Sequence, residues 1–392
     1  MNSQDLTLQT YSDFESLLPW RSQWDELTQD NPMLGFVWQS NWWNAFADSK
    51  RGDRKQLAVA VLFDSQENVA GIVPCYIATT TTARVLRFLG DGKVASDYLR
   101  LLSREGCEER VATRMVEWIQ SADFQQQFGP LDRIECEGHR GSEPTIELLW
   151  AKLSANGWTE HAVGIEGSWR IEFPSDWPAL RKLFCKSYQR KSNKAQRMLE
   201  NGSIEFNWMT TPDQIVESWP DFVRLHQKRR SALGQLGCFT EPQFELFLSQ
   251  AVLELSESGK AVLGLIHHQQ KPIAATLLLL SADCAMMYQS GIDPDCSHLE
   301  PGHLVNNFSL EWTMQLGKSS FDFLRGDESY KRGWGAHRTE LYRTRMIAPR
   351  WISQLKHSLW LTARRAKAMV VDASLSNPKP RTISKIEEPK SC

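Results

Sequence analysis

The chain has 392 residues, of which 41% are apolar and 23% are charged, as expected for a folded protein of two or three domains. Its net charge of −2 provides no overall field that would attract nucleic acid, and no apolar run approaches the roughly 18 residues of a membrane span. The eight cysteines are scattered, without a C-x-x-C pair or a Cys/His spacing suited to zinc. We therefore expect reduced thiols, no metal site and a cytoplasmic location.

The first half of the chain is expected to begin with tryptophan-rich helices and to continue as a small sheet. Its further predicted elements, in chain order, are strands over 57–63, 69–77 and 84–89, a helix over 108–121 and a strand over 131–136.

The second half repeats this order of hairpin, strand, helix and strand. Its predicted elements are strands over 261–266, 273–280 and 285–289, a helix over 301–316 and a strand over 321–324. The repeat predicts a duplicated α+β (mixed α/β) domain, each copy a mixed, mainly antiparallel sheet flanked by helices. We expect the halves at 1–165 and 166–350, with a helix and a disordered tail over 351–392.

Further helices are expected ahead of the second hairpin. One is predicted from about 177 to 200, one starts at Pro212, and another runs from Pro220 to Leu233. Residues 240–243 have the pattern of a capping box, and the helix that they open should end at Gly259.

Basic residues recur at helical spacing in the helix predicted over 177–200. Lys186, Arg190, Lys194 and Arg197 would share one face. That face is either a solvated surface or a cationic wall for a phosphate-bearing cofactor or an anionic glycan precursor. An RNA contact has less support, because few aromatic residues are interleaved.

Two histidines are candidates for chemistry. His226 lies late in a predicted helix and could act as a general base, with a structural hydrogen-bonding role as the alternative. His303 follows Pro301 and Gly302 at a helix start, where free N–H groups favour a phosphate. No nucleophile elbow, Walker loop or dinucleotide fingerprint is present.

The richest polar segment comes after the last predicted strand. Residues 321–331 run from alternating apolar positions into Gly326, and then to two acids, Tyr330 and Lys331. The alternatives are a surface hairpin with solvated charges and a strand end that presents reactive groups.

Several segments together resemble the CelD/BcsL-like (BioF-like) acetyltransferase family, a branch of the GNAT superfamily related to the FemAB peptidyltransferases. The similar segments span roughly residues 10 to 347 and are 71–74, 87–90, the basic helix to 202, 225–230, 237–239, 288–291, 301–302 and 322–331.

The resemblance implies tandem GNAT-like domains that transfer an acyl group from acetyl-CoA or another acyl-CoA to an amine, with a sugar-derived acceptor of exopolysaccharide or cell-envelope synthesis. No permanently bound cofactor is implied. One departure is that the loop with which typical GNAT enzymes bind the CoA pyrophosphate is absent before Pro301. FemAB-type proteins also lack it and use aminoacyl-tRNA instead.

On this basis the second half should hold the active cleft, with a degenerate first half that frames it or binds the acceptor. The residues implied are Asp322, Asp327, Tyr330, Lys331 and His226 for catalysis, Pro301, Gly302, His303, Tyr288 and Gln289 for the acyl-CoA, and Arg190, Lys191, Arg230 and Arg325 for the substrate. We expect Lys331→Ala or Asp322→Asn to lower turnover and leave the fold intact.

Two other readings stay open: an aminoacyl-tRNA-dependent transferase, which would use the basic helix to bind RNA, and a non-catalytic glycan- or nucleotide-binding accessory protein. The acceptor and the oligomeric state are not specified by the sequence.

Overall fold

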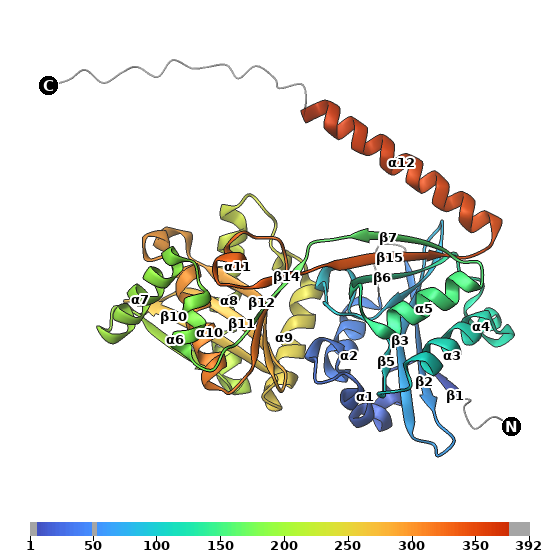
Figure 1. Ribbon diagram of the computed structural model, residues 1–392, viewed down its shortest axis with the longest axis horizontal. Coiled ribbons are helices and arrows are strands. Elements are labelled where there is room, and N and C mark those ends of the chain that lie inside the picture. The colour runs from blue at the N-terminus through green and yellow to red at the C-terminus, as the bar shows by residue number, and fades with distance from the viewer. Residues whose placement is uncertain (1–5, 49–52, 376–392) are drawn as a thin grey trace.

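The computed structural model describes residues 6–48 and 53–375, with side chains in this range up to residue 364. It contains two mixed sheets placed side by side, each flanked by helices (Figure 1). The disordered tail expected after Asn377 lies outside the described residues.

The two sheets have the same strand order. The first sheet runs β1 (Thr7–Tyr11), β2 (Arg54–Phe63), β3 (Val69–Thr79), β4 (Arg84–Phe88), β6 (Arg133–Arg140), β15 (Leu341–Ile347) and β7 (Thr159–Gly164), with β5 (Leu102–Ser103) beside β3. The second runs β9 (Glu205–Met209), β10 (Ala261–His268), β11 (Lys271–Leu280), β12 (Cys284–Ile292), β13 (Ser320–Arg325), β8 (Ser168–Glu172) and β14 (His337–Thr339). The predicted repeat of hairpin, strand, helix and strand is confirmed.

The pairing directions repeat as well. Each sheet is antiparallel except for one short parallel pair, β4 with β6 and β12 with β13, and each of these pairs covers only three residues on a strand. Past these residues the paired strands separate. Each sheet is therefore split beyond its parallel pair.

The halves exchange strands. The chain passes from the first sheet into the second between β7 and β8, and it returns to the first between β14 and β15. β15 lies between β6 and β7, in the position that β8 occupies between β13 and β14. The expected second half, 166–350, was therefore wrong for β15, because alternation within a strand gives its buried face and not the sheet that it joins.

Helices cover both faces of the sheets. The helices of the described residues are α1 (Arg21–Leu27), α2 (Phe36–Phe46), α3 (Glu108–Gln120), α4 (Ala122–Phe128), α5 (Pro144–Ala155), α6 (Trp177–Leu183), α7 (Lys186–Glu200), α8 (Pro212–Ala232), α9 (Pro242–Glu257), α10 (Pro301–Gln315), α11 (Tyr330–Gly333) and α12 (Trp351–Leu375), and all but α12 lie against the body of the molecule. In the second half α8 and α9 pack on one face of the sheet, and α7 and α10 pack on the other.

The helix predicted over 177–200 is two helices. Phe184 and Cys185 are extended between α6 and α7. Phe184 is buried against Trp334, with 4.9 Å between ring centroids. Burial of an aromatic ring offsets the break in helical hydrogen bonding.

The two helices predicted to start at Pro212 and Pro220 are one helix, α8. Thr211 and Gln214 form a capping box at its start, and Pro220 lies inside it. A proline inside a helix costs about 3 kcal/mol. Burial of Ile215, Phe222 and Leu225 against the sheet can offset this cost, at roughly 2 kcal/mol for each side chain.

The capping box predicted at residues 240–243 was also wrong. Glu241 is the N-cap of α9 without a side-chain cap, because its carboxylate pairs with Lys93 of the first half. Pro242 does stand in the first turn, as predicted.

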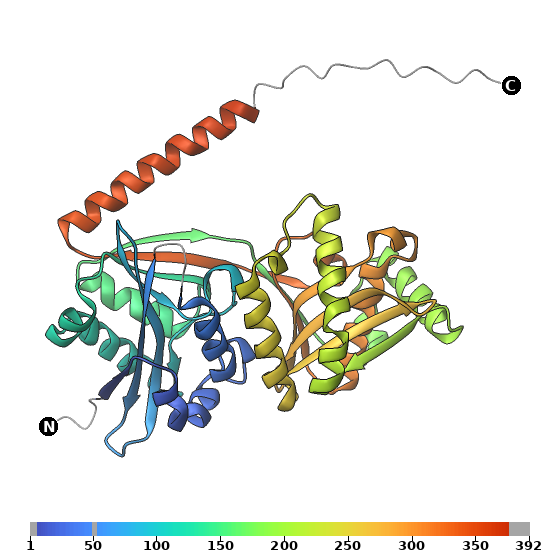
Figure 2. The same cartoon turned by 180° about the vertical axis from the view of Figure 1, so that it is seen from behind.

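One apolar core continues from the first half into the second. α2 packs against α9 between the two sheets (Figures 1 and 2). Trp38 of α2 is fully buried, with its ring 4.8 Å from Phe247 of α9 and 5.0 Å from Tyr288 of β12. The relation between the halves is therefore fixed by packed aromatic rings as well as by exchanged strands.

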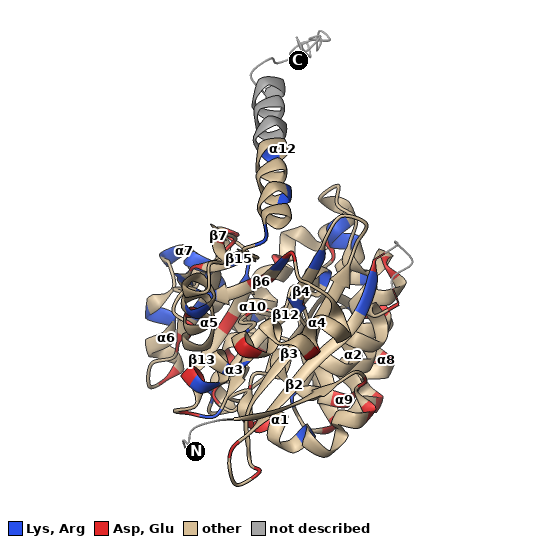
Figure 3. Cartoon of the chain, turned by 90° about the vertical axis from the view of Figure 1, so that its right-hand side faces the viewer, with Lys and Arg blue, Asp and Glu red and all other residues tan. Residues whose placement is uncertain are grey.

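α12 extends away from the body of the molecule (Figures 1 and 3). Its base is attached through Ser353 and Lys356, which both donate hydrogen bonds to Asp132. Within the part of the chain that the structure describes, no helix has the length and apolar character of a membrane span.

Candidate active site

A cavity of about 450 Å³ lies between the two halves, and we call it the first cavity. It is lined by His226 and Arg230 of α8, Cys238, Glu241 and Gln289 from the second half, and Lys93 from the first. β12 and β13 pair only up to Met286 and Asp322, so Gln289 lies beyond the point where the sheet splits. Three predicted residues from two separate segments, His226 and Arg230 from one and Gln289 from the other, are brought together here.

The close packing of α8 on β12 fixes His226. Gly291 of β12 lies directly under α8, and a side chain at this position would overlap the backbone of Leu225 and His226. His226 is 1% exposed, and its Nδ1 lies 3.2 Å from Oε1 of Gln227. Burial lowers the pKa of His226, so the imidazole is neutral at neutral pH.

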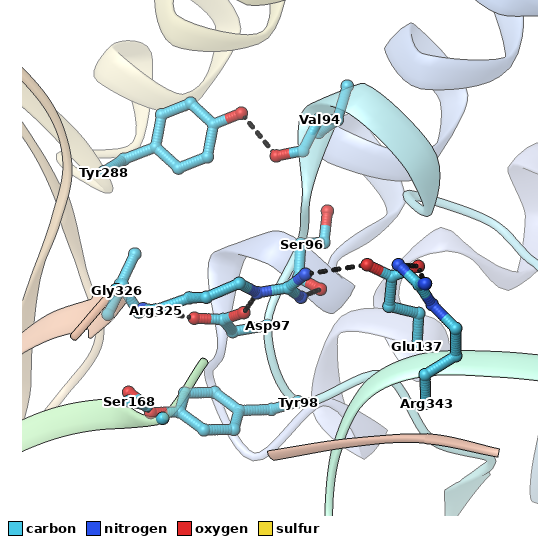
Figure 4. Close-up of polar contacts among 12 residues, drawn as sticks. Val94, Ser96, Asp97, Tyr98, Glu137, Ser168, Tyr288, Arg325, Gly326 and Arg343 are labelled. Carbon is cyan, nitrogen blue, oxygen red and sulfur yellow. Dashed lines mark hydrogen bonds and ion pairs between the residues drawn. The ribbon is translucent and has the colours of Figure 1, made fainter. Parts of the chain in front are cut away.

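A bulge in β12 determines how Tyr288 and Gln289 are placed. Leu278 pairs with Met287 and Leu277 pairs with Gln289, which leaves Tyr288 as the extra residue. The Tyr288 hydroxyl donates to the carbonyl oxygen of Val94 at 2.8 Å (Figure 4). Tyr288 was predicted to contact acyl-CoA, but its hydroxyl is used in the contact between the halves, whereas Gln289 faces the first cavity.

A second cavity of about 520 Å³ adjoins the first and is lined mainly by the first half. The two cavities share Lys93, Thr240 and Glu241, so the Lys93–Glu241 ion pair lies between them. Besides the Lys93–Glu241 pair, the side chains of the second cavity that matter chemically are aromatic or charged: Trp42, Phe46, Asp48, Asp53, Lys55, Tyr76, Arg87 and Asp91.

Asp91 is the most perturbed carboxyl group of the second cavity. Its Oδ1 accepts a hydrogen bond from Tyr76 at 2.8 Å, and Arg87 lies 3.6 Å from its Oδ2. Burial raises the pKa of Asp91 to about 6, against the opposing effects of Arg87 and Tyr76. A buried carboxyl group with a pKa near neutrality is a frequent feature of functional sites.

Asp322 lies outside both cavities. It is fully buried and accepts hydrogen bonds from Ser168 at 3.0 Å, from the Leu324 N–H at 2.7 Å and from the hydroxyl of Tyr98 in the first half. These contacts join β13, β8 and the first half. They give Asp322 a structural position, which sequence reasoning could not distinguish from a catalytic one.

Lys331 is also enclosed. Its ammonium donates to the carbonyl oxygens of Leu324, Arg325 and Gly326 at 3.0–3.1 Å, and Glu328 lies 2.9 Å away. The side chain is 2% exposed, and Leu324 has a left-handed φ of 56°. Lys331 thus holds a strained turn and has no free donor for an oxyanion.

Asp327 and Tyr330 flank this turn. Asp327 is exposed, and a hydrogen bond from Arg338 lowers its pKa to about 2, so it is a weak proton acceptor at neutral pH. Tyr330 packs against Phe323, and burial raises its pKa.

Arg325 connects the two halves through ion pairs (Figure 4). Its Nε donates to Asp97 at 2.7 Å, and its Nη1 donates to Glu137 at 3.1 Å, which Arg343 also contacts. A side chain on Gly138 would overlap the guanidinium, so the close fit depends on a glycine at this position. The predicted substrate-binding Arg325 is thus engaged between the halves.

The start of α10 is covered by α7. Lys191 lies 2.6 Å from Glu300, the N-cap of α10, and its Nζ is 3.0 Å from Nε2 of His303. Burial, together with Lys191, lowers the pKa of His303 to about 4. Pro301 is buried and Gly302 borders open space, so the predicted phosphate site has a carboxylate at its entrance. Arg190 is exposed on α7, where Figure 3 shows a concentration of basic residues.

Residues 185–332 match the sequence model of the acetyltransferase (GNAT) domain. The match contains α7 to α10, most of α11 and all the second-half residues of the first cavity, and it supports acyltransferase chemistry. A search of curated protein sequences finds no match.

Solved structures show the same fold at low identity. The crystal structure of FemX has a TM-score of 0.62 at 10% identity, covering 86% of this chain and 98% of that one. A conserved protein of unknown function from Bacteroides thetaiotaomicron has a TM-score of 0.52 at 12% identity, with 87% and 100% covered. L-PGS from Bacillus licheniformis has 0.51 at 9% identity, with 85% and 91% covered.

Sequence reasoning missed Lys93, Glu241, Cys238 and the whole second cavity. One signal was available, because Asp91, Gly92 and Lys93 follow the predicted strand over 84–89 after a single glycine. Polar groups at this strand end are candidates for a site for the same reason as those of residues 321–331.

Proposed function

We propose that the protein is an N-acyltransferase that moves an acyl group from an acyl-CoA to an amine in the cleft between its halves. The observation that carries this proposal is the first cavity, in which a neutral buried imidazole, a guanidinium and an amide from the segment that matches the GNAT domain meet Lys93 of the first half. Much of the rate would come from holding thioester and amine together.

Each group has a role in this reaction. Arg230 and Lys93 are cations for the phosphates of the donor. Gln289 can donate a hydrogen bond to the thioester oxygen, on which negative charge develops. His226 accepts the proton that the attacking amine must lose. In this proposal Asp322 and Lys331 hold the scaffold, and the catalytic roles expected for them and for Asp327 and Tyr330 have less support.

For the acceptor we propose an amine-bearing sugar of an exopolysaccharide or cell-envelope precursor, handled in the cytoplasm as in CelD/BcsL-like proteins. The second cavity supports this choice. Its tryptophan and tyrosine rings can pack against a sugar, and its carboxyl groups can attract an ammonium group. The first half would then bind the acceptor, and changes there should act mainly on KM.

The basic surface of α7 favours a second candidate, an aminoacyl-tRNA donor. Arg190, Lys194 and Arg197 are exposed on this helix. Binding of RNA through them would weaken steeply with salt.

Calorimetric titration of the protein with acetyl-CoA and longer acyl-CoAs tests the donor. We expect micromolar binding that Arg230→Gln weakens, whereas the control Lys182→Gln, an exposed change on α6, leaves it unaltered. Binding of tRNA but of no acyl-CoA would favour the second candidate. Binding of CoA and amino sugar without any amide product would leave only an accessory role.

A further inference from the structure

Cys238 and His226 form a thiol–imidazole pair in the first cavity. The Cys238 Sγ lies 3.7 Å from Nε2 of His226, within hydrogen-bonding range for sulfur. Both residues line the cavity, and Cys238 is half-buried. The sulfur is thus accessible from the space in which we place the acyl donor.

The second nitrogen of the imidazole fixes its tautomer. Nδ1 lies 3.2 Å from Oε1 of Gln227, an amide oxygen that can only accept. Nδ1 therefore carries the hydrogen, and the lone pair of Nε2 points at the thiol. A nucleophile, a base and a group that orients the base are the three parts of an activated cysteine.

Close packing holds the pair in place. A side chain on Gly237 would overlap the Gln227 amide, so only glycine lets the Cys238 loop approach α8 so closely. The ring of Phe239 stands edge-on to the imidazole, with 5.0 Å between centroids. Among the cysteines of the described residues, Cys238 is the one whose sulfur contacts an imidazole.

We propose that Cys238 is a nucleophile that carries the acyl group, as an enzyme-bound thioester, from the donor to the amine. This rests on the proposed function and adds a covalent step to it. Transfer would then proceed by two displacements instead of one.

The two displacements balance without an oxidant or a reductant. In the first, Sγ attacks the donor thioester while Nε2 of His226 takes the thiol proton, and the bond between carbonyl carbon and donor sulfur breaks. The imidazolium returns that proton to the departing thiolate. In the second, the amine attacks the acyl-Cys238 carbonyl, loses a proton to His226 and forms the amide, and Sγ leaves and regains the proton.

The thiol–imidazole pair is neutral at rest, so the thiolate has to form during the attack. Burial raises the pKa of the Cys238 thiol to about 12, against the lowering effects of Arg230 and the N–H groups of Cys238 and Phe239. The proton therefore stays on sulfur until attack begins. The same guanidinium and N–H groups can then stabilise the negative charge that develops beside them.

Intact-protein mass spectrometry tests the step directly. Protein carrying Cys185→Ser, which removes the exposed thiol just before α7, is incubated with acetyl-CoA without an amine, and separately with the activated ester p-nitrophenyl acetate. We expect one acetyl group, mapped to the Cys238 peptide, that is transferred when an amine is added. Cys238→Ala should abolish labelling, His226→Gln should slow it about 100-fold, and Cys296→Ala should leave it unaltered.

The outcomes separate the two proposals. Amide formation that persists in Cys238→Ala, without an acyl-enzyme, overturns the covalent step and leaves the N-acyltransferase intact. Labelling of Cys238 by p-nitrophenyl acetate that depends on His226, with no labelling by any acyl-CoA, keeps the nucleophile and overturns the CoA donor. Labelling of Cys238 by neither reagent overturns the inference, whatever the donor.

Discussion

At the scale of single residues, the structure distinguishes side chains for which the sequence predicted the same role. Lys331 and His226 were both candidates for catalysis, and both are at most 2% exposed. Lys331 is surrounded by acceptors that use its protons, whereas His226 keeps one nitrogen toward a cavity. Free hydrogen-bonding capacity beside a cavity, rather than burial, distinguishes the two.

Lys331→Met should therefore act on stability. Removal of the ammonium leaves the carbonyl oxygens of residues 324–326 without a partner, which should lower the free energy of unfolding by about 3 kcal/mol. Urea denaturation followed by tryptophan fluorescence measures this. Unchanged stability together with lost turnover would instead restore the catalytic role first expected for Lys331.

The pH profile of kcat/KM reports on His226. Because burial lowers its pKa below the ordinary 6.5, most of the imidazole is neutral at pH 6.5, and the neutral base is lost as the pH falls through the lowered pKa. The midpoint of the acid-side fall in the profile should therefore lie below the ordinary histidine pKa of about 6.5. His226→Gln should lower the rate and remove that fall.

The unmodified protein and His226→Gln are assayed with the same substrates. The ionisation of the substrates then cancels in the ratio of the two kcat/KM values. An acid-side fall that survives in His226→Gln would assign the proton acceptor to another group.

At the scale of elements, the contact of α8 with β12 places the cavity. Gly291→Ala should push α8 from the sheet, lower the free energy of unfolding by about 2 kcal/mol and displace His226. Gly302→Ala is a matched control for stability, since open space surrounds that position at the start of α10, and it should stabilise by about 0.5 kcal/mol. Thermal unfolding of both variants measures the difference, and equal midpoints would refute the close contact.

The sequence predicted the repeated core of each half because hydrophobic periodicity is a local signal. The buried face of α3, with Val111, Met115 and Ile119, is an example. Local periodicity could not show that β15 joins the first sheet. Nor could it show that the Glu241 carboxylate pairs with Lys93 and does not cap α9. Both features depend on segments that are distant in the sequence. His226, Arg230 and Gln289 were found by residue type, but their meeting in one cavity is a tertiary fact.

At the scale of the whole molecule, the exchanged strands make the halves interdependent. A chain that ends after Glu340 loses β15, so β6 and β7 of the first sheet lose the strand between them. We expect such a chain not to fold in either half. A chain that ends after Pro349 keeps β15, loses only residues 350–392 with α12 among them, and should fold.

Circular dichroism and size-exclusion chromatography of the two truncated chains measure this. A folded, monomeric chain that ends after Glu340 would show that β15 is dispensable.

The exchange also bears on the history of such a molecule. If the repeat arose by gene duplication, each copy could at first have been lost or replaced without harm to the other. Once β8 and β15 had changed places, neither copy retained a complete sheet of its own. From then on a lineage could let the chemistry of one half decay, but it could not delete that half.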